Sequence, residues 1–341
     1  MISNNYSINN INKMKRISKK YYCNDTVSDY HYFSTILFYV STMYFLSYTN
    51  PIICSIAFIF NILFKARLFM IFHDLCHLNF YKDTQKNIQY AKYIETFCFF
   101  IYKDWAYGHN EHHTKHGTIE SGNIIDPAST VFITKKKYNE LNIIKKVIFN
   151  VIRFPPIFLT ILTIYFTYGS LIRLFWLNEH LKYSNIVIYQ IKYISFLYIY
   201  YLFSNFNTIK LFAISNLITM FLGVILFHLQ HAVNIGSLKV INNNNDKINV
   251  DINNSSFLKI PNFLKYFTSG IEYHHIHHFS TRIPGYNMKL LHDELNKLNL
   301  LKNKQEVGYL QAFKSLFHVY YNEKTNRYES QYIFKIIGLE H

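Results

Sequence analysis

Residues 52–77 read IICSIAFIFNILFKARLFMIFHDLCH, an apolar run that leads directly into two histidines. The apolar part, 52–72, has the length of a membrane-spanning helix, which needs roughly 17–25 mostly apolar residues. Another apolar run, 32–48, lies before it in the chain, and a short polar break separates the two runs. The two runs predict a membrane hairpin. Lys65 and Arg67 interrupt the second run, and we expect their long side chains to reach the polar interface.

Three further apolar runs lie beyond the histidines. Residues 154–172 and 211–227 could each span a membrane, whereas 186–203 carries Lys192 near its centre and is ambiguous. We therefore predict an all-α integral membrane protein with about four transmembrane helices, or up to six, and a cytoplasmic helical cap. The predicted divisions are a basic cytoplasmic tail (1–31), a transmembrane hairpin (32–72), a cytoplasmic region (73–153), a transmembrane region (154–231) and a second cytoplasmic region (232–341).

Composition and charge agree with a membrane location. Half of the 341 residues are hydrophobic and 16% are charged, against about 25% charged in a soluble domain. Five of the 35 Lys and Arg lie in the N-terminal tail, eleven in 73–153 and thirteen after His231. Because cytoplasmic segments retain Lys and Arg, these three regions should share the cytoplasmic side. The net charge of +15 then needs no nucleic-acid partner. The Asn-rich run 241–246 is predicted to be a loop.

Histidines gather in three short clusters: His73-Asp74-Leu75-Cys76-His77, His109-Asn110-Glu111-His112-His113 with His116 just after, and His274-His275-Ile276-His277-His278. On a helix, residues three or four apart share one face, so the histidines of each cluster project together. Imidazole nitrogen suits Fe, Zn, Cu and Ni, and eight such side chains exceed what one tetrahedral zinc ion uses. The spacing therefore predicts two metal ions. The eight histidines are His73, His77, His109, His112, His113, His274, His277 and His278.

Other residues near the clusters receive separate predictions. Asp74 is placed to accept a hydrogen bond from a ligand imidazole and so to fix its tautomer. We expect Glu111 to be a solvated charge and Cys76 a small buried residue. Either His228 or His231, at the end of an apolar run, is placed to supply a further ligand. The remaining histidines are expected to be neighbours of the site (His116, His275) or surface residues (His31, His180, His292, His318, His341).

The clusters and their flanks resemble the membrane fatty acid desaturase family over roughly residues 52–295. RLFMIF (67–72) runs into the first cluster and NFYK (79–82) follows it. SFLKIP (256–261) leads toward the third cluster and FSTRIPGYN (279–287) follows it. The similarity is strongest to the acyl-lipid desaturases, especially the bacterial phospholipid and Δ12-like groups.

The resemblance implies a non-heme di-iron centre that uses O₂ to insert a cis double bond into a fatty acyl chain. It also implies His231, in the Gln230-His231 pair that ends an apolar run, as an additional iron ligand beside the eight cluster histidines. No cytochrome b5-like His-Pro-Gly-Gly motif is present, so electrons would arrive from a separate ferredoxin or cytochrome b5. The membrane would be the endoplasmic reticulum in a eukaryotic host and the plasma membrane in a bacterial one.

Several alternatives stay open. An acyl hydroxylase, a carotenoid ketolase or a sphingolipid desaturase could use the same histidine clusters, although the segment 282–287 favours the acyl-lipid group. A metal transporter or sensor would place its ligands inside the bilayer, whereas these clusters lie outside or at the ends of the apolar runs. A catalytically inactive regulator is a further alternative. The basic runs 135–137 and 145–146 fit either a solvated face near anionic headgroups or a docking patch for an acidic electron donor.

Overall fold

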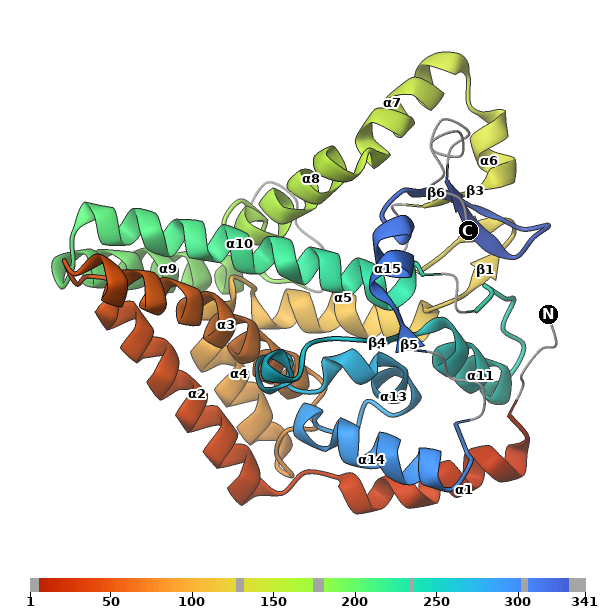
Figure 1. The fold of residues 1–341 in the computed structure, drawn as a ribbon, viewed down its shortest axis with the longest axis horizontal. Helices are drawn as coiled ribbons and strands as arrows, with labels where there is room; N and C mark the ends of the chain where they lie inside the picture. The colour runs from red at the N-terminus through yellow and green to blue at the C-terminus, as the bar shows by residue number, and fades with distance from the viewer. Residues whose placement is uncertain (1–5, 127–131, 174–180, 234–235, 302–305, 331–341) are drawn as a thin grey trace.

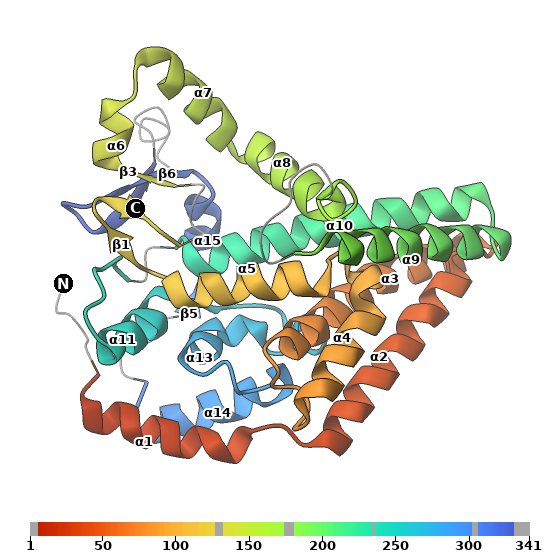
Figure 2. The ribbon, with the colours of Figure 1, turned by 180° about the vertical axis from the view of Figure 1, so that it is seen from behind.

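The computed structural model describes residues 6–126, 132–173, 181–233, 236–301 and 306–330, and most of them are helical, as predicted. Long helices occupy one end of the molecule, and a cap of shorter helices and small sheets occupies the other (Figure 1). α5 (Tyr102–Lys115) runs alongside α10 (Phe206–His231) from the long helices into the cap (Figure 2). The other long helices are α2 (Asp25–Phe45), α3 (Pro51–Cys76), α4 (Thr84–Cys98), α9 (Tyr183–Leu202) and α10 (Phe206–His231).

Helices α2 and α3 pack as a helical hairpin where the sequence predicts a membrane hairpin, and its crossing of the membrane stays a prediction. The Asn50 side chain accepts hydrogen bonds from the N–H groups of Ile52 and Ile53, and Pro51 occupies the first turn, where no N–H is needed. α3 continues past Phe72 to Cys76, so the first histidine cluster begins on its last turn. Its 26 residues rise about 39 Å. Because the hydrocarbon core is only about 30 Å thick, that last turn can lie beyond it.

Two described helices, α3 and α10, are long and apolar enough to cross a membrane. A third candidate is the pair α7 (Ile143–Arg153) and α8 (Pro155–Tyr168), taken together despite a bend of 72°. α2 and α9 do not meet the same test of length and apolar content. The number of four crossings therefore stays a prediction, and so do the boundaries of the membrane and cytoplasmic regions.

The prediction that Lys65 and Arg67 reach the interface is wrong, because both side chains are buried among the helices. Lys65 Nζ lies 4.3 Å from the ring centroid of Phe212 and has no hydrogen-bond partner among the described residues. Arg67 Nε donates to Thr35 Oγ1 at 3.0 Å, and its guanidinium stacks on the ring of Tyr266 at 3.9 Å. Neighbouring helices, rather than the lipid–water boundary, therefore surround both charges.

The largest apolar cluster of the cap draws residues from distant segments. The N-terminal segment predicted to be a polar tail forms a helix that buries Met14 and Ile17 in this cluster. The Asn-rich run is a loop only in part, because the Asn243 side chain caps a helix whose Ile252 is fully buried. The cap helices are α1 (Ile8–Ser18), η1 (Lys19–Tyr21), α11 (Asn244–Asn254), η4 (Asn262–Leu264), α12 (Lys265–Thr268), η5 (Ile271–Tyr273), α13 (His274–Phe279) and α14 (Gly285–Lys297).

Short strands complete the cap and form three small sheets among the described residues. β3 pairs in parallel with β6, with Ile133 opposite Tyr320, and β6 pairs antiparallel with β7. This sheet joins the segment after α5 to the last part of the described chain. The remaining elements are β1 (Ile119–Glu120), β2 (Asn123–Ile124), β3 (Ile133–Thr134), α6 (Lys135–Glu140), β4 (Phe257–Leu258), β5 (Glu306–Val307), α15 (Tyr309–Ser315), β6 (His318–Asn322) and β7 (Arg327–Ser330).

Candidate metal centre

The three histidine clusters meet where α3, α5, α10 and α13 come together. The first cluster lies on the last turn and C-cap of α3, the second on α5 and the third on α13. Nine side chains form two groups, and the candidate ligand atoms of each group lie within 4.8 Å of one another. The first group contains His73, His77, His109, His113 and His277. The second group contains His112, His231, His274 and His278.

In the first group, imidazole Nε2 atoms crowd together. His109 Nε2 lies 3.0 Å from His73 Nε2 and 3.1 Å from His113 Nε2, and His277 Nε2 lies 2.9 Å from His113 Nε2. His77 Nε2 is buried without a hydrogen-bond partner among the described residues. A neutral imidazole carries one N–H and one lone pair, so Nε2 atoms cannot all satisfy one another. A shared cation would satisfy the lone pairs of the whole group.

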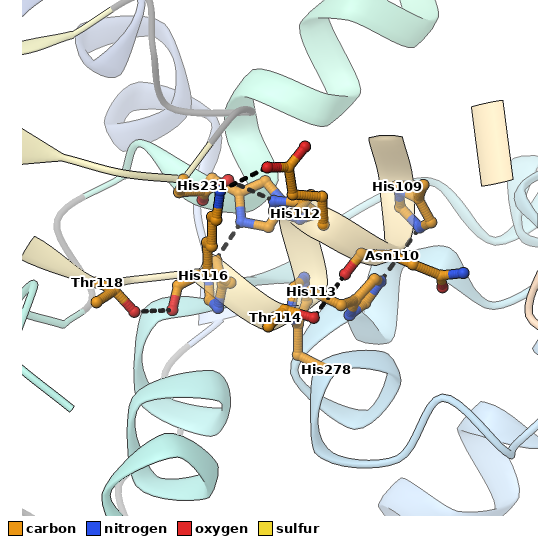
Figure 3. Close-up of polar contacts among 12 residues, drawn as sticks. His109, Asn110, His112, His113, Thr114, His116, Thr118, His231 and His278 are labelled. Atoms are coloured by element: carbon orange, nitrogen blue, oxygen red, sulfur yellow. Dashed lines mark hydrogen bonds and ion pairs between the residues drawn. The ribbon is translucent and has the colours of Figure 1, made fainter. Parts of the chain in front are cut away.

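The second group repeats this arrangement. His274 Nε2 lies 3.0 Å from both His231 Nε2 and His278 Nε2. His112 Nε2 is buried and lacks a hydrogen-bond partner among the described residues. Figure 3 shows the α5 histidines in a row, with His231 beside His112 at one end and His109 at the other. The two groups are therefore neighbours.

Helical spacing explains why α5 and α13 each serve both groups. His109 and His113 are four residues apart and enter the first group, whereas His112 is offset around α5 and enters the second. On α13 the pair four residues apart, His274 and His278, enters the second group, and His277 enters the first. Both α5 and α13 thus lie between the two groups.

A carboxylate oxygen lies within hydrogen-bond distance of Nδ1 in two of the imidazoles. His73 Nδ1 lies 3.1 Å from Asp74 Oδ1, and the other Asp74 oxygen accepts a hydrogen bond from the N–H of Gly285 at 2.6 Å. His112 Nδ1 lies 2.8 Å from Asp126 Oδ1. A carboxylate at Nδ1 fixes the N–H there and leaves the Nε2 lone pair for a metal. The geometry at Asp74 is the one expected from the sequence.

His231 has a longer connection behind it. Its Nδ1 lies 3.1 Å from His116 Nε2, and His116 Nδ1 lies 3.1 Å from Asp251 Oδ1; both His116 and Asp251 are buried. His116, Asp251 and His278 are close enough to form a third metal-binding group. The Lys247 ammonium, however, already makes an ion pair with the same Asp251 carboxylate oxygen. We therefore interpret His116 and Asp251 as a hydrogen-bonded support for His231.

The side chains present suit a transition-metal ion. Burial, reinforced by neighbouring imidazoles, holds the pKa of His109, His113 and His277 well below the usual 6.5. These side chains are therefore neutral at physiological pH, the form that binds metals. With two buried, unpartnered Nε2 atoms at His77 and His112, the all-imidazole donor set fits iron, copper, zinc or nickel.

The other histidines lie outside these groups, except for His116 in the third. His275 Nε2 lies 3.0 Å from His292 Nδ1, and His228 Nε2 donates to the carbonyl oxygen of Ser315 at 3.0 Å. The surface prediction is wrong for His292 and His318, which are buried. His31 is partly buried and contacts Arg67. His180 and His341 fall outside the described residues.

Smaller predictions agree with the structure, and sequence reasoning missed two acids. Glu111 makes a partly exposed ion pair with Lys115 one turn away, and Cys76 is buried. Asp126 and Asp251 were missed because neither has a fixed spacing from a histidine cluster. Asp126 returns to His112 only after the β1–β2 hairpin, and Asp251 approaches from α11. Only their tertiary placement identifies them.

Comparison with known proteins identifies the same region. The fatty acid desaturase family matches residues 49–306, which include all nine histidines of the two groups. A protein from Bacillus subtilis (strain 168) named fatty acid desaturase is 25% identical over 276 residues. The alignment covers 78% of this chain and 74% of that protein. The resemblance predicted from the histidine clusters and their flanks is confirmed.

Proposed function

This chain belongs to the fatty acid desaturase family, and from that premise we propose that it is a membrane-bound acyl-lipid desaturase. It would insert a cis double bond into a fatty acyl chain, using two non-heme iron ions and O₂. The observation that carries the proposal is the convergence of nine buried or half-buried histidines in two adjacent groups at the ends of apolar helices.

The proposed ligand sets follow the two groups. One ion would be held by His73, His77, His109, His113 and His277, and the other by His112, His231, His274 and His278. When bound, the iron ions would supply the oxidising chemistry that an unactivated methylene C–H bond requires. Overall, two hydrogens leave adjacent carbons, and O₂ takes them up with two further electrons and two protons to give two waters. The two electrons would come from a separate ferredoxin or cytochrome b5.

The chain's own residues orient the ligands. Asp74 and Asp126 hold the N–H of His73 and of His112 at Nδ1, which leaves each Nε2 lone pair facing its group. Burial lowers the pKa of His109, His113 and His277 and so keeps these imidazoles neutral. Because reacting atoms must be held within a fraction of an ångström, this fixed orientation supports a selective oxidation.

Aromatic side chains line the site. The Trp105 ring stacks on His109 with centroids 4.3 Å apart, and Phe72 packs against Trp105. Phe227 contacts the rings of both His112 and His231. These apolar walls are suited to an acyl chain and would limit loss of the oxidant to water.

The location is part of the proposal. The histidine groups would face the cytoplasm, because most Lys and Arg lie in the segments around them. The membrane would be the endoplasmic reticulum in a eukaryotic host or the plasma membrane in a bacterial host. A cytoplasmic site would also be open to a soluble electron donor.

Expression in a host with mostly saturated and monounsaturated lipids tests the function. Fatty acid methyl esters would be compared by mass spectrometry for the wild type, His277→Ala and the matched control His275→Ala. His275 lies on the same helix but outside both groups. We expect a new double bond that is lost in His277→Ala and retained in His275→Ala. A hydroxylated product would instead identify the chain as an acyl hydroxylase with the same histidine clusters. Purified protein without bound metal would refute the proposed centre.

A further inference from the structure

Helix α7 presents an aliphatic face that nothing in the described structure covers. Around the helix axis, at 100° per residue, its aliphatic side chains occupy one continuous half of the circumference. Their exposed fractions run from 45% for Ile152 to 74% for Ile143. The six residues of this face are Ile143, Ile144, Val147, Ile148, Val151 and Ile152.

The opposite face of α7 is fixed to the protein. Lys146 Nζ donates to the carbonyl oxygen of Asn139 at 3.1 Å, and Tyr138 donates to Asn150 Oδ1 at 3.1 Å. The Arg153 side chain is buried, and its guanidinium lies 4.1 Å from the ring centroid of Phe158 on α8. The helix is therefore held with its aliphatic face outward, and rotation to bury that face would break these contacts.

The exposed apolar surface continues around the bend into α8. There Ile157, Ile161 and Ile164 are exposed along α8. Figure 1 shows α7 standing away from the body of helices, whereas α8 runs from it down to α10. α8 packs against α10, one of the two helices able to cross a membrane. With α8 along the bilayer normal, the 72° bend would place α7 about 20° from the bilayer plane.

Basic residues lie beside this face. Lys145 is exposed at its edge on α7, and Lys136 and Lys137 are exposed on α6 just before it. Glu140 is the exposed acid in the same segment. An aliphatic face flanked by lysines is the pattern of a helix that lies at the headgroup–acyl boundary of a membrane with anionic lipids.

We propose that α7 is an in-plane membrane helix, with its aliphatic face in the acyl boundary and Lys145 beside anionic headgroups. The proposal goes beyond the desaturase function and holds independently of it. It assigns the bent α7–α8 pair to an interfacial helix followed by a membrane helix, rather than to one span. It also places the leaflet surface beside the contact between Phe158 of α8 and His228 of α10. His228 lies about one helical turn before His231 on α10.

Depth measurements on the full chain in lipid nanodiscs test the orientation. Single cysteines at Ile144 and Val151, with the half-buried Cys23 and Cys54 changed to serine, would carry a fluorophore quenched by lipids labelled at known depths. The two sites are seven residues, or about 10.5 Å, apart along the helix. An in-plane helix predicts depths within about 4 Å of each other near the headgroup boundary, whereas a spanning helix predicts a difference of about 10 Å.

Two further measurements complete the test. A label at Glu140→Cys, on the polar side of the same segment, should show little quenching. Labelled anionic lipid should quench Ile144→Cys more than labelled zwitterionic lipid at equal bulk fraction, and Lys145→Glu should reduce that preference. A 10 Å depth difference, or no quenching at Ile144 and Val151, would overturn the in-plane assignment. Equal quenching by the two lipids in the wild type would overturn the anionic-headgroup part.

Discussion

Replacing His116 with alanine should weaken the binding of one metal ion and spare the other. In the tautomer that leaves His231 Nε2 free, His231 Nδ1–H donates to His116 Nε2 at 3.1 Å, and His116 Nδ1–H donates to Asp251 at 3.1 Å. Alanine would leave a buried N–H without an acceptor. It would also allow His231 to move its proton to Nε2, the atom that must bind the metal.

The expected size follows from these contacts. An unsatisfied buried donor costs about 1–3 kcal/mol, which corresponds to a factor of about 5 to 150 in an equilibrium constant. Removing a group that orients a metal ligand typically lowers affinity about 10- to 100-fold. We therefore expect the second group to lose about 10- to 100-fold in intrinsic affinity, while the intrinsic affinity of the first group, which His116 does not contact, changes little. Asp251→Asn should act in the same direction with a smaller effect.

The assay is an anaerobic Fe(II) titration of the metal-free protein against a competing chelator, fitted to two sites. His116→Gln retains a side-chain acceptor and should restore part of the affinity. His292→Ala is the matched control, because it breaks a buried His–His contact of 3.0 Å outside both groups. Wild-type affinity at both sites in His116→Ala, or an equal loss in His292→Ala, would refute the reasoning.

Three other substitutions test separate parts of the structure. Asp126→Asn should lower the affinity of the second group for its metal ion about tenfold in the same titration, because His112 Nδ1 loses its charged acceptor. A loss of affinity at the first group instead would contradict this. Gly270→Ala should cost about 2–4 kcal/mol in the free energy of unfolding, since Gly270 has φ of 83° and a Cβ there would lie 2.2 Å from the Gly285 carbonyl oxygen; an unchanged thermal midpoint in detergent would count against it. Lys65→Met should keep or raise that midpoint, because it removes a buried amine that has no hydrogen-bond partner among the described residues; a large fall would mean that the amine has a stabilising partner.

The sequence was most informative where spacing repeats locally. The clusters at His109–His113 and His274–His278 show helical periodicity, and the structure places both on helices. The apolar run before His73 likewise predicted the hairpin of α2 and α3. Such local patterns depend on a few neighbouring residues, and those neighbours are visible in the sequence.

The sequence was least informative where tertiary packing decides the outcome. From the sequence we expected the side chains of Lys65 and Arg67 to extend to the polar interface, yet α2, α10 and α12 surround them. Asp251 gains its place behind His116 because α11 forms within an Asn-rich segment that reads as a loop. The division of nine histidines between two ions likewise depends on the rotation of α5 and α13 against each other, which no single segment encodes.

That division has a consequence for how the centre fills. Because α5 and α13 carry ligands for both groups, the first ion to bind restricts the rotation and translation of both helices. The second group then starts from a partly ordered state, so its ion binds with a smaller loss of conformational freedom. By thermodynamic reciprocity, each ion raises the affinity for the other. Under limiting iron, half-loaded molecules should therefore be fewer than two independent sites of the same intrinsic affinities would give.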